Sequence, residues 1–204
     1  RDFVTRLSPS DRASIVSYNG ATRVLAPFTS SKEDLLDALL RLEKASPRGL
    51  SWEAQYRQTA QDLRTSRPSA RSSILRSWSA QASSRERSAL SELRRSVSAL
   101  AARSGKRTLL LVTNGYEWYP GQTLAQAYGF SSLAQFDEDI GEEIRRVYET
   151  ANRSGITIQV FDAKGLAVDS DASRALPSPV SPFSKAQNFR DSMVAFASET
   201  GGTL

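Results

Sequence analysis

The first part of the chain alternates apolar and polar residues on either side of a tight turn, and this pattern predicts two antiparallel strands. Residues 12–18 (RASIVSY) and 22–28 (TRVLAPF) form the two runs, and Asn19-Gly20 between them is typical of a hairpin turn. Pro27 has no backbone N–H, so it places the second strand at an edge or near a strand end.

After the hairpin, apolar residues recur at helical spacing along much of the remaining chain. Thr29-Ser30-Ser31 supplies capping side chains for a leucine-rich helix over residues 32–44. The long region 46–104 contains no strand pattern. The spacing predicts further helices at 52–63, 84–102, 133–152 and 184–198, and residues 1–7 resemble the last turns of another helix.

Two apolar runs in the second half of the chain predict buried strands. Residues 107–113 (RTLLLVT) form a continuous rather than alternating apolar run, which indicates a central strand covered on both faces. Residues 156–161 (ITIQVF) predict the next buried strand. The helix expected between them makes a right-handed strand–helix–strand unit. We therefore predict an α/β fold with a three-layer helix–sheet–helix architecture and ligands at the carboxyl ends of its strands, after Thr113 and at Asp162.

Composition narrows the chemistry that the chain can perform. The 204 residues fit one domain and contain no cysteine and no histidine. Disulfide frameworks, thiol catalysis, histidine triads and zinc sites are therefore excluded. Any metal must bind to oxygen atoms only, as Mg²⁺ or Ca²⁺ does. No phosphate loop or nucleophile elbow is present, so we expect a protein that is not an enzyme.

The positive charge is concentrated in one segment. The chain has a net charge of +5, and residues 64–107 contain eleven Lys and Arg against only two Glu. This segment could bind nucleic acid or an anionic surface. It is also rich in Ser and Ala and offers only Trp78 as a stacking aromatic, so a solvated helix face is the favoured interpretation. No apolar run reaches the roughly 18 residues that span a membrane.

The order of several short motifs resembles the von Willebrand factor A (vWA) domain, and most closely the vWA-related domains of acidobacterial secreted proteins. These motifs extend over nearly all of the chain. They are LSPSDR at residues 7–12, APFT at 26–29, GKR at 105–107 followed by LLLVTNG at 109–115, VFDAKGL at 160–166 and ASETGG at 197–202.

This resemblance implies a Rossmann-like sheet that is mostly parallel, with one antiparallel edge strand. It also implies a single domain over residues 1–204 with a Ser/Arg-rich helical insertion at about 46–105. Both ends look truncated, and the family's first strand would precede Arg1. Because that strand is central in the family's sheet, we expect a gap or rearranged pairing beside residues 109–113.

The family holds a divalent cation at the carboxyl edge of its sheet, and the resemblance carries part of that site over to this chain. Asn114 stands where the family has an aspartate, and the position of a further ligand falls near Ser51. The family's principal ligand motif would lie before Arg1. A Mg²⁺ or Ca²⁺ site is therefore implied with an incomplete set of ligands.

A protein–protein interaction or adhesion module is the function that we expect from these features. Aromatic residues after the strand end could form a binding hot spot, or they could pack locally under the loop. The expected partner-binding residues are Tyr116, Glu117, Trp118, Tyr119, Asp162 and Lys164. The resemblance implies a protein partner and a secreted or cell-envelope location. Binding of nucleic acid or an anionic surface through residues 64–107 is the alternative.

Overall fold

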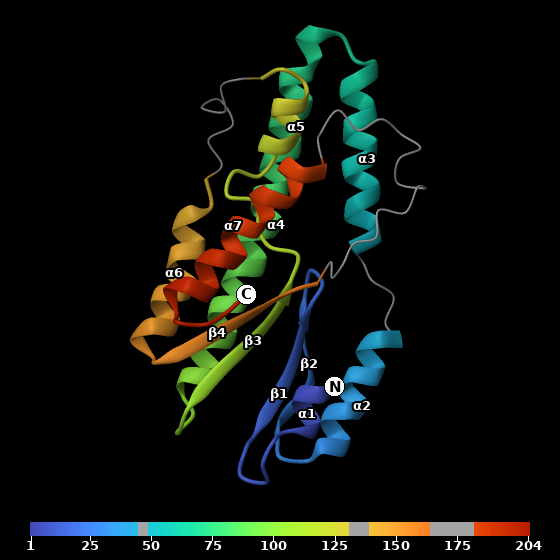
Figure 1. The fold of residues 1–204 in the computed structure, drawn as a ribbon. Coiled ribbons are helices and arrows are strands. Elements are labelled where there is room, and N and C mark those ends of the chain that lie inside the picture. The colour runs from blue at the N-terminus through green and yellow to red at the C-terminus, as the bar shows by residue number, and fades with distance from the viewer. Residues whose placement is uncertain (45–48, 131–138, 164–181) are drawn as a thin grey trace. The chain divides into compact units, whose positions relative to one another are not determined.

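The fold is mixed α/β, with helices and two small sheets (Figure 1). The computed structural model describes residues 1–44, 49–130, 139–163 and 182–204. The chain divides into two compact units, Arg1–Tyr56 and Arg57–Leu204. Each unit contains one two-stranded sheet, antiparallel in the first and parallel in the second.

The first unit contains the predicted hairpin and the helix that follows it. Helix α1 (Asp2–Thr5) precedes strands β1 (Ala13–Tyr18) and β2 (Thr22–Thr29), and α2 spans Lys32–Lys44. The two strands pair antiparallel, with irregular register on either side of Ile15. Both the hairpin and α2 are confirmed, since α2 has the predicted ends. A small core joins them and consists of Val4, Ala26, Leu35 and Ala38.

Two helices occupy the long region without strands. Helix α3 (Gly49–Thr65) begins in the first unit and continues into the second, and α4 (Pro68–Ala101) runs for 34 residues. The sequence predicts a helix over residues 84–102 and leaves open whether residues 72–82 extend it. Helix α4 is longer because no glycine or proline interrupts it after Pro68, which stands in its first turn where a missing N–H costs nothing.

The second unit is built around a parallel pair of strands. Strands β3 (Arg107–Thr113) and β4 (Ile156–Asp162) pair in continuous register, from Arg107 with Ile156 to Thr113 with Asp162. Helix α6 (Gly141–Arg153) forms the crossover and α7 (Pro182–Glu199) follows β4. One face of the sheet is covered by α4, α6 and α7. The core there includes Leu90, Val97, Ile144, Val147, Ile156, Ile158, Val160, Met193 and Phe196.

The other face of this sheet is exposed at Val112 and Phe161, which differs from the predicted architecture. Val112 is 67% exposed and Phe161, its partner in the register, is 52% exposed. Within the described ranges β3 has a strand neighbour on one side only. The gap expected beside residues 109–113 stays a prediction. The three-layer sheet is not what these residues show, because their four strands form two separate pairs.

Helix boundaries between β3 and β4 also differ from the prediction. Residues 122–127, which follow the turn signal Pro120-Gly121, form the short helix α5 (Gln122–Ala127). The helix predicted from residue 133 begins at Gly141, since Asp139 and Ile140 are not helical and residues 131–138 lie outside the described part.

Candidate functional site

The loop after β3, residues 114–121, is organised around the buried carboxylate of Glu117. This side chain is 6% exposed. Its Oε2 accepts a hydrogen bond from the N–H of Gly121 at 3.0 Å. Its Oε1 accepts one from the N–H of Thr123 at 2.9 Å and another from the Thr123 hydroxyl. Glu117 thus binds the free N–H groups at the start of α5, where negative charge is favourable.

A second glutamate, Glu86 of α4, lies against the same loop. Its Oε2 accepts the backbone N–H of Glu117 at 3.1 Å. Burial, together with the negative charge of Glu117, raises the pKa of Glu86 from 4.5 to about 8, and Arg85 opposes the shift in part. At neutral pH Glu86 is therefore mostly protonated, and the interior avoids two adjacent negative charges.

Helices α4 and α7 hold the loop at three further points. The N–H of Tyr116 donates to Ser192 Oγ at 2.7 Å, and that hydroxyl donates to the carbonyl of Phe189 at 2.9 Å. The Ser79 hydroxyl donates to the carbonyl of Pro120. Gly115 has a φ of +82°, and a Cβ there would lie 2.1 Å from the Phe189 carbonyl oxygen. The loop therefore has little freedom to move.

The four residues predicted to form an exposed cluster have different environments. Glu117 is interior, which corrects its expected place on a binding surface, because its oxygens are engaged by the loop. Tyr116 is half-buried and packs edge-on against Phe196, with ring centroids 6.0 Å apart. Trp118 is half-buried against the core, and its buried Nε1 has no partner within the described residues. Tyr119 projects outward and is 47% exposed.

The remaining predicted site residues lie at or near the strand ends. Asn114 and Asp162 are exposed at the carboxyl ends of β3 and β4, and the N–H of Ala163 donates to the Thr113 carbonyl at 2.8 Å. The parallel register thus brings Asn114 and Asp162 to one edge of the sheet. Lys164 lies outside the described residues.

The cation site implied by the resemblance stays a prediction. They contain no group of three or more acidic side chains that could hold a metal ion. Ser51 lies in helix α3 and belongs to the first unit, whereas Asn114 belongs to the second. Asn114 and Ser51 would supply one amide oxygen and one hydroxyl oxygen, and Mg²⁺ or Ca²⁺ requires further oxygen ligands.

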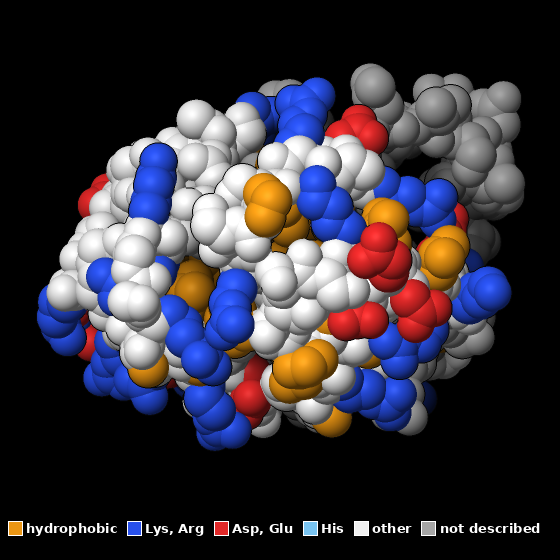
Figure 2. Space-filling view, turned by 90° about the horizontal axis from the view of Figure 1, so that it is seen from below, with side chains coloured by type: hydrophobic (Ala, Val, Ile, Leu, Met, Phe, Trp, Pro, Cys, Tyr) orange, Lys and Arg blue, Asp and Glu red, His pale blue; other side chains and the backbone are white. Residues whose placement is uncertain are grey.

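The arginines of residues 64–107 are partly engaged within the chain. Arg87 pairs with Glu143 at 3.2 Å, and Arg95 pairs with Glu92 at 2.9 Å. Arg107 donates to the carbonyls of Ala101 and Arg103 at the end of α4. Figure 2 shows basic side chains interspersed with acidic and apolar ones on the face in view.

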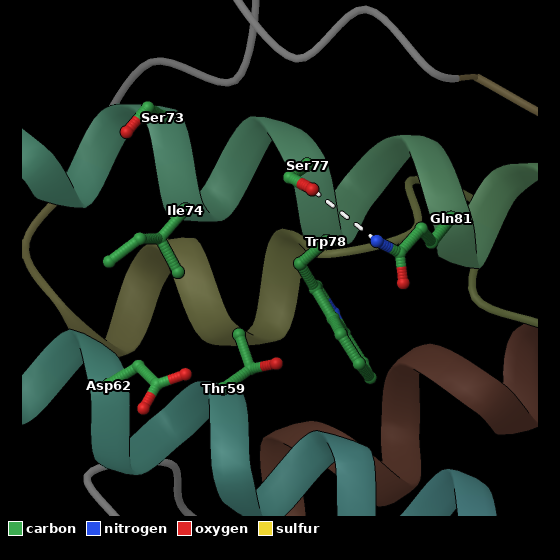
Figure 3. Close-up of a pocket in the computed structure, with 7 residues that line it drawn as sticks. All are labelled: Thr59, Asp62, Ser73, Ile74, Ser77, Trp78 and Gln81. Carbon is green, nitrogen blue, oxygen red and sulfur yellow. Dashed lines mark hydrogen bonds between the residues drawn. The ribbon is translucent and has the colours of Figure 1, made fainter.

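A shallow cavity of about 340 Å³ lies between α3 and α4 (Figure 3). Its lining is mostly neutral and polar, with Asp62 as its single charged side chain. Gln58 Nε2 donates to Asp62 Oδ1 at 2.8 Å, and Gln81 Nε2 donates to Ser77 Oγ at 3.4 Å.

Comparison with known proteins adds no relative. The chain matches no protein-family model, no curated protein sequence and no solved structure. The vWA resemblance therefore stays a prediction. None of the described helices combines the length and the apolarity needed to cross a bilayer.

Proposed function

We propose that this chain is a protein-binding module without enzymatic activity, and that it binds a protein partner at the carboxyl edge of the β3–β4 sheet. Tyr119, Asn114 and Asp162 are the exposed side chains that would contact the partner. One observation carries the proposal: a loop fixed from inside by Glu117, Glu86 and Ser192 presents an exposed aromatic ring, that of Tyr119.

A rigid loop with an outward tyrosine has the properties of a binding hot spot. Tyrosine offers a large apolar area and a hydroxyl while losing little rotamer freedom. The internal hydrogen bonds order the backbone of the loop before a partner binds. Less conformational entropy is therefore lost on binding, and the contacts contribute more to the free energy of association. The carboxyl groups of Glu86 and Glu117 have structural partners and are almost fully buried, so they favour a positioning role over acid–base chemistry.

A three-layer vWA-type sheet and a secreted or cell-envelope location are part of this proposal. The order of the vWA-like motifs supports both, and the parallel β3–β4 pair with its helical crossover supports the sheet. Interaction at the carboxyl edge does not require a metal. Cation dependence would need oxygen ligands beyond Asn114 and Ser51.

Site-specific photo-cross-linking tests the function. A photoreactive phenylalanine analogue replaces Tyr119, and the same analogue replaces Tyr18 of the hairpin as a matched exposed control. In an extract of the source cells we expect a discrete cross-linked protein from position 119 and none from position 18. Excess wild-type chain should suppress that adduct, whereas excess Tyr119→Ala chain should not. Identical adduct patterns from both positions would contradict the proposal.

A further inference from the structure

Two nearly buried carboxyl groups lie on the inner side of the loop after β3. Glu86 is 5% exposed and Glu117 is 6% exposed. The Glu86 carboxyl accepts the backbone N–H of Glu117 at 3.1 Å, so this one side chain joins α4 to the loop. Both residues belong to the second unit, so the contact lies within one compact body.

The two carboxyl groups have unequal surroundings. Three donors converge on Glu117, namely the N–H groups of Gly121 and Thr123 and the Thr123 hydroxyl, and such donors favour a negative charge there. Burial and the charge of Glu117 raise the pKa of Glu86 to about 8, against the opposing effects of Arg85 and of the Glu117 N–H. A proton on Glu86 therefore lets both side chains stay in the interior.

The basic residue after Glu86 on α4 is engaged with the start of α6. Arg87 pairs with Glu143 at 3.2 Å and donates to the backbone carbonyl of Asp139 at 3.2 Å. The Asp139 carboxylate accepts the N–H of Gly141 at 2.7 Å. These charges therefore have partners of their own on the α6 side of the loop.

The other elements around the loop add no further buried charge among the described residues. Helix α5 carries no charged residue. Arg190 and Asp191 of α7 are exposed, and Arg107 of β3 donates to carbonyls at the end of α4. Of the described carboxylates, Glu117 is therefore the one that opposes ionisation of Glu86.

We propose that Glu86 is a proton-operated latch for the loop 114–121: its protonated carboxyl holds the loop closed, and its ionisation opens the loop. An ionised Glu86 sets a second negative charge beside Glu117 where little water reaches either group. The stronger hydrogen bond from the Glu117 N–H offsets only part of this cost, since the pKa of Glu86 is raised on balance. Opening of the loop lets water reach both carboxylates.

Proton linkage gives the size of the effect. Glu86 has a pKa of about 8 in the closed loop and returns to its ordinary value of 4.5 once water reaches it in the open loop. Between these values opening releases one proton, so the opening equilibrium rises about tenfold per pH unit. The rise ends above the pKa of the closed loop. Because the loop carries Tyr119, partner binding should weaken over the same range; this consequence rests on the proposed function, whereas the opening itself does not.

Amide hydrogen exchange of the full chain at pH 5 and pH 7 tests the latch. The protection factor of each amide, its slowing relative to an unstructured peptide at the same pH, is compared between the loop and β4. The loop amides are those of Glu117, Gly121 and Thr123, which donate to the two carboxyl groups, and Ile158 reports on β4. Glu86→Gln is the matched control, because it keeps an acceptor for the Glu117 N–H and does not ionise.

We expect the protection factors of the loop amides to fall about a hundredfold from pH 5 to pH 7 in the wild type and to stay constant in Glu86→Gln. Ile158 should remain better protected than the loop at both pH values. An equal fall in Glu86→Gln overturns the proposal, because another group then controls opening. Loop amides as protected as Ile158 at both pH values also overturn it, since the loop then opens only when the whole unit unfolds.

A titration of the wild type keeps the test independent of the variant. The side-chain carboxyl carbon of Glu86 is followed by nuclear magnetic resonance as the pH is raised. A midpoint nearer to about 8 than to 4.5 supports the latch. A midpoint nearer to 4.5 overturns it, whether or not Glu86→Gln folds.

Discussion

The backbone N–H of Glu117 donates to the carboxyl group of Glu86 across 3.1 Å, and this contact joins residues 31 positions apart in the sequence. Two glutamates thus lie together in the interior of a chain that has no histidine and no cysteine. The carboxylate oxygens of Glu117 accept hydrogen bonds from the N–H groups at the start of α5. The carboxyl group of Glu86 in turn holds the backbone of Glu117. The loop that presents Tyr119 depends on both.

Stability should fall as the pH rises from about 4.5 to about 8. In the folded chain Glu86 keeps its proton up to a pKa of about 8, whereas the unfolded chain loses it near 4.5. Between these values the folded state binds more protons, so raising the pH favours unfolding. Glu86→Gln keeps an acceptor for the Glu117 N–H and removes the titration.

Urea unfolding at pH 5 and pH 8 measures this effect. Glu86→Gln should show a smaller loss of stability between the two values than the wild type. Equal losses in the two proteins would show that Glu86 does not govern the pH dependence.

Glu117→Ala should destabilise the chain by about 3 kcal/mol, because it leaves the buried N–H groups of Gly121 and Thr123 without their charged acceptor. Hydrogen exchange at these two amides should accelerate more than exchange at Ile158 in β4. Uniform acceleration throughout the second unit would instead mean that the loop and the sheet unfold together.

Gly115→Ala should cost at least about 2 kcal/mol of folding free energy, because a Cβ there meets the Phe189 carbonyl as well as an unfavourable φ. Gly105→Ala is the matched control. Gly105 has a similar φ of +88° with open space around it, so only the backbone cost of roughly 1 to 2 kcal/mol remains. Chemical denaturation of the two variants should therefore rank them in that order.

Tyr119→Ala should change the free energy of unfolding by less than about 0.5 kcal/mol, because its side chain lies at the surface. The same variant should lose competition in the cross-linking experiment. Normal stability combined with lost competition would assign Tyr119 to binding. A large drop in melting temperature would place its role in folding instead.

The strands and α2 are well predicted because the residues that determine them are neighbours in the sequence. The apolar run at 107–113 coincides with β3, and the alternating residues around Asn19-Gly20 form the hairpin. The same apolar run misleads about burial. Whether a strand is covered on both faces depends on elements distant in sequence, and the exposed face at Val112 is a tertiary property.

The arrangement of side chains in the loop after β3 was harder to predict from the sequence. Tyr116, Glu117, Trp118 and Tyr119 form one segment in the sequence, but only Tyr119 points outward while Glu117 turns inside. The backbone of Glu117 is held by Glu86 of α4, and no local sequence pattern connects these two residues. Residues 122–127 are mostly good helix formers and so carry a local signal for α5. They directly follow Pro120-Gly121, a pair that is typical of a turn.

The hydrogen bond from the Val160 N–H to the Thr203 carbonyl has a consequence for the outer edge of β4. Together with the bond from the Ile158 N–H to Thr200 Oγ1, it occupies donors that a foreign strand would need in order to pair there. Residues 200–203 thus protect the β4 edge against edge-to-edge aggregation.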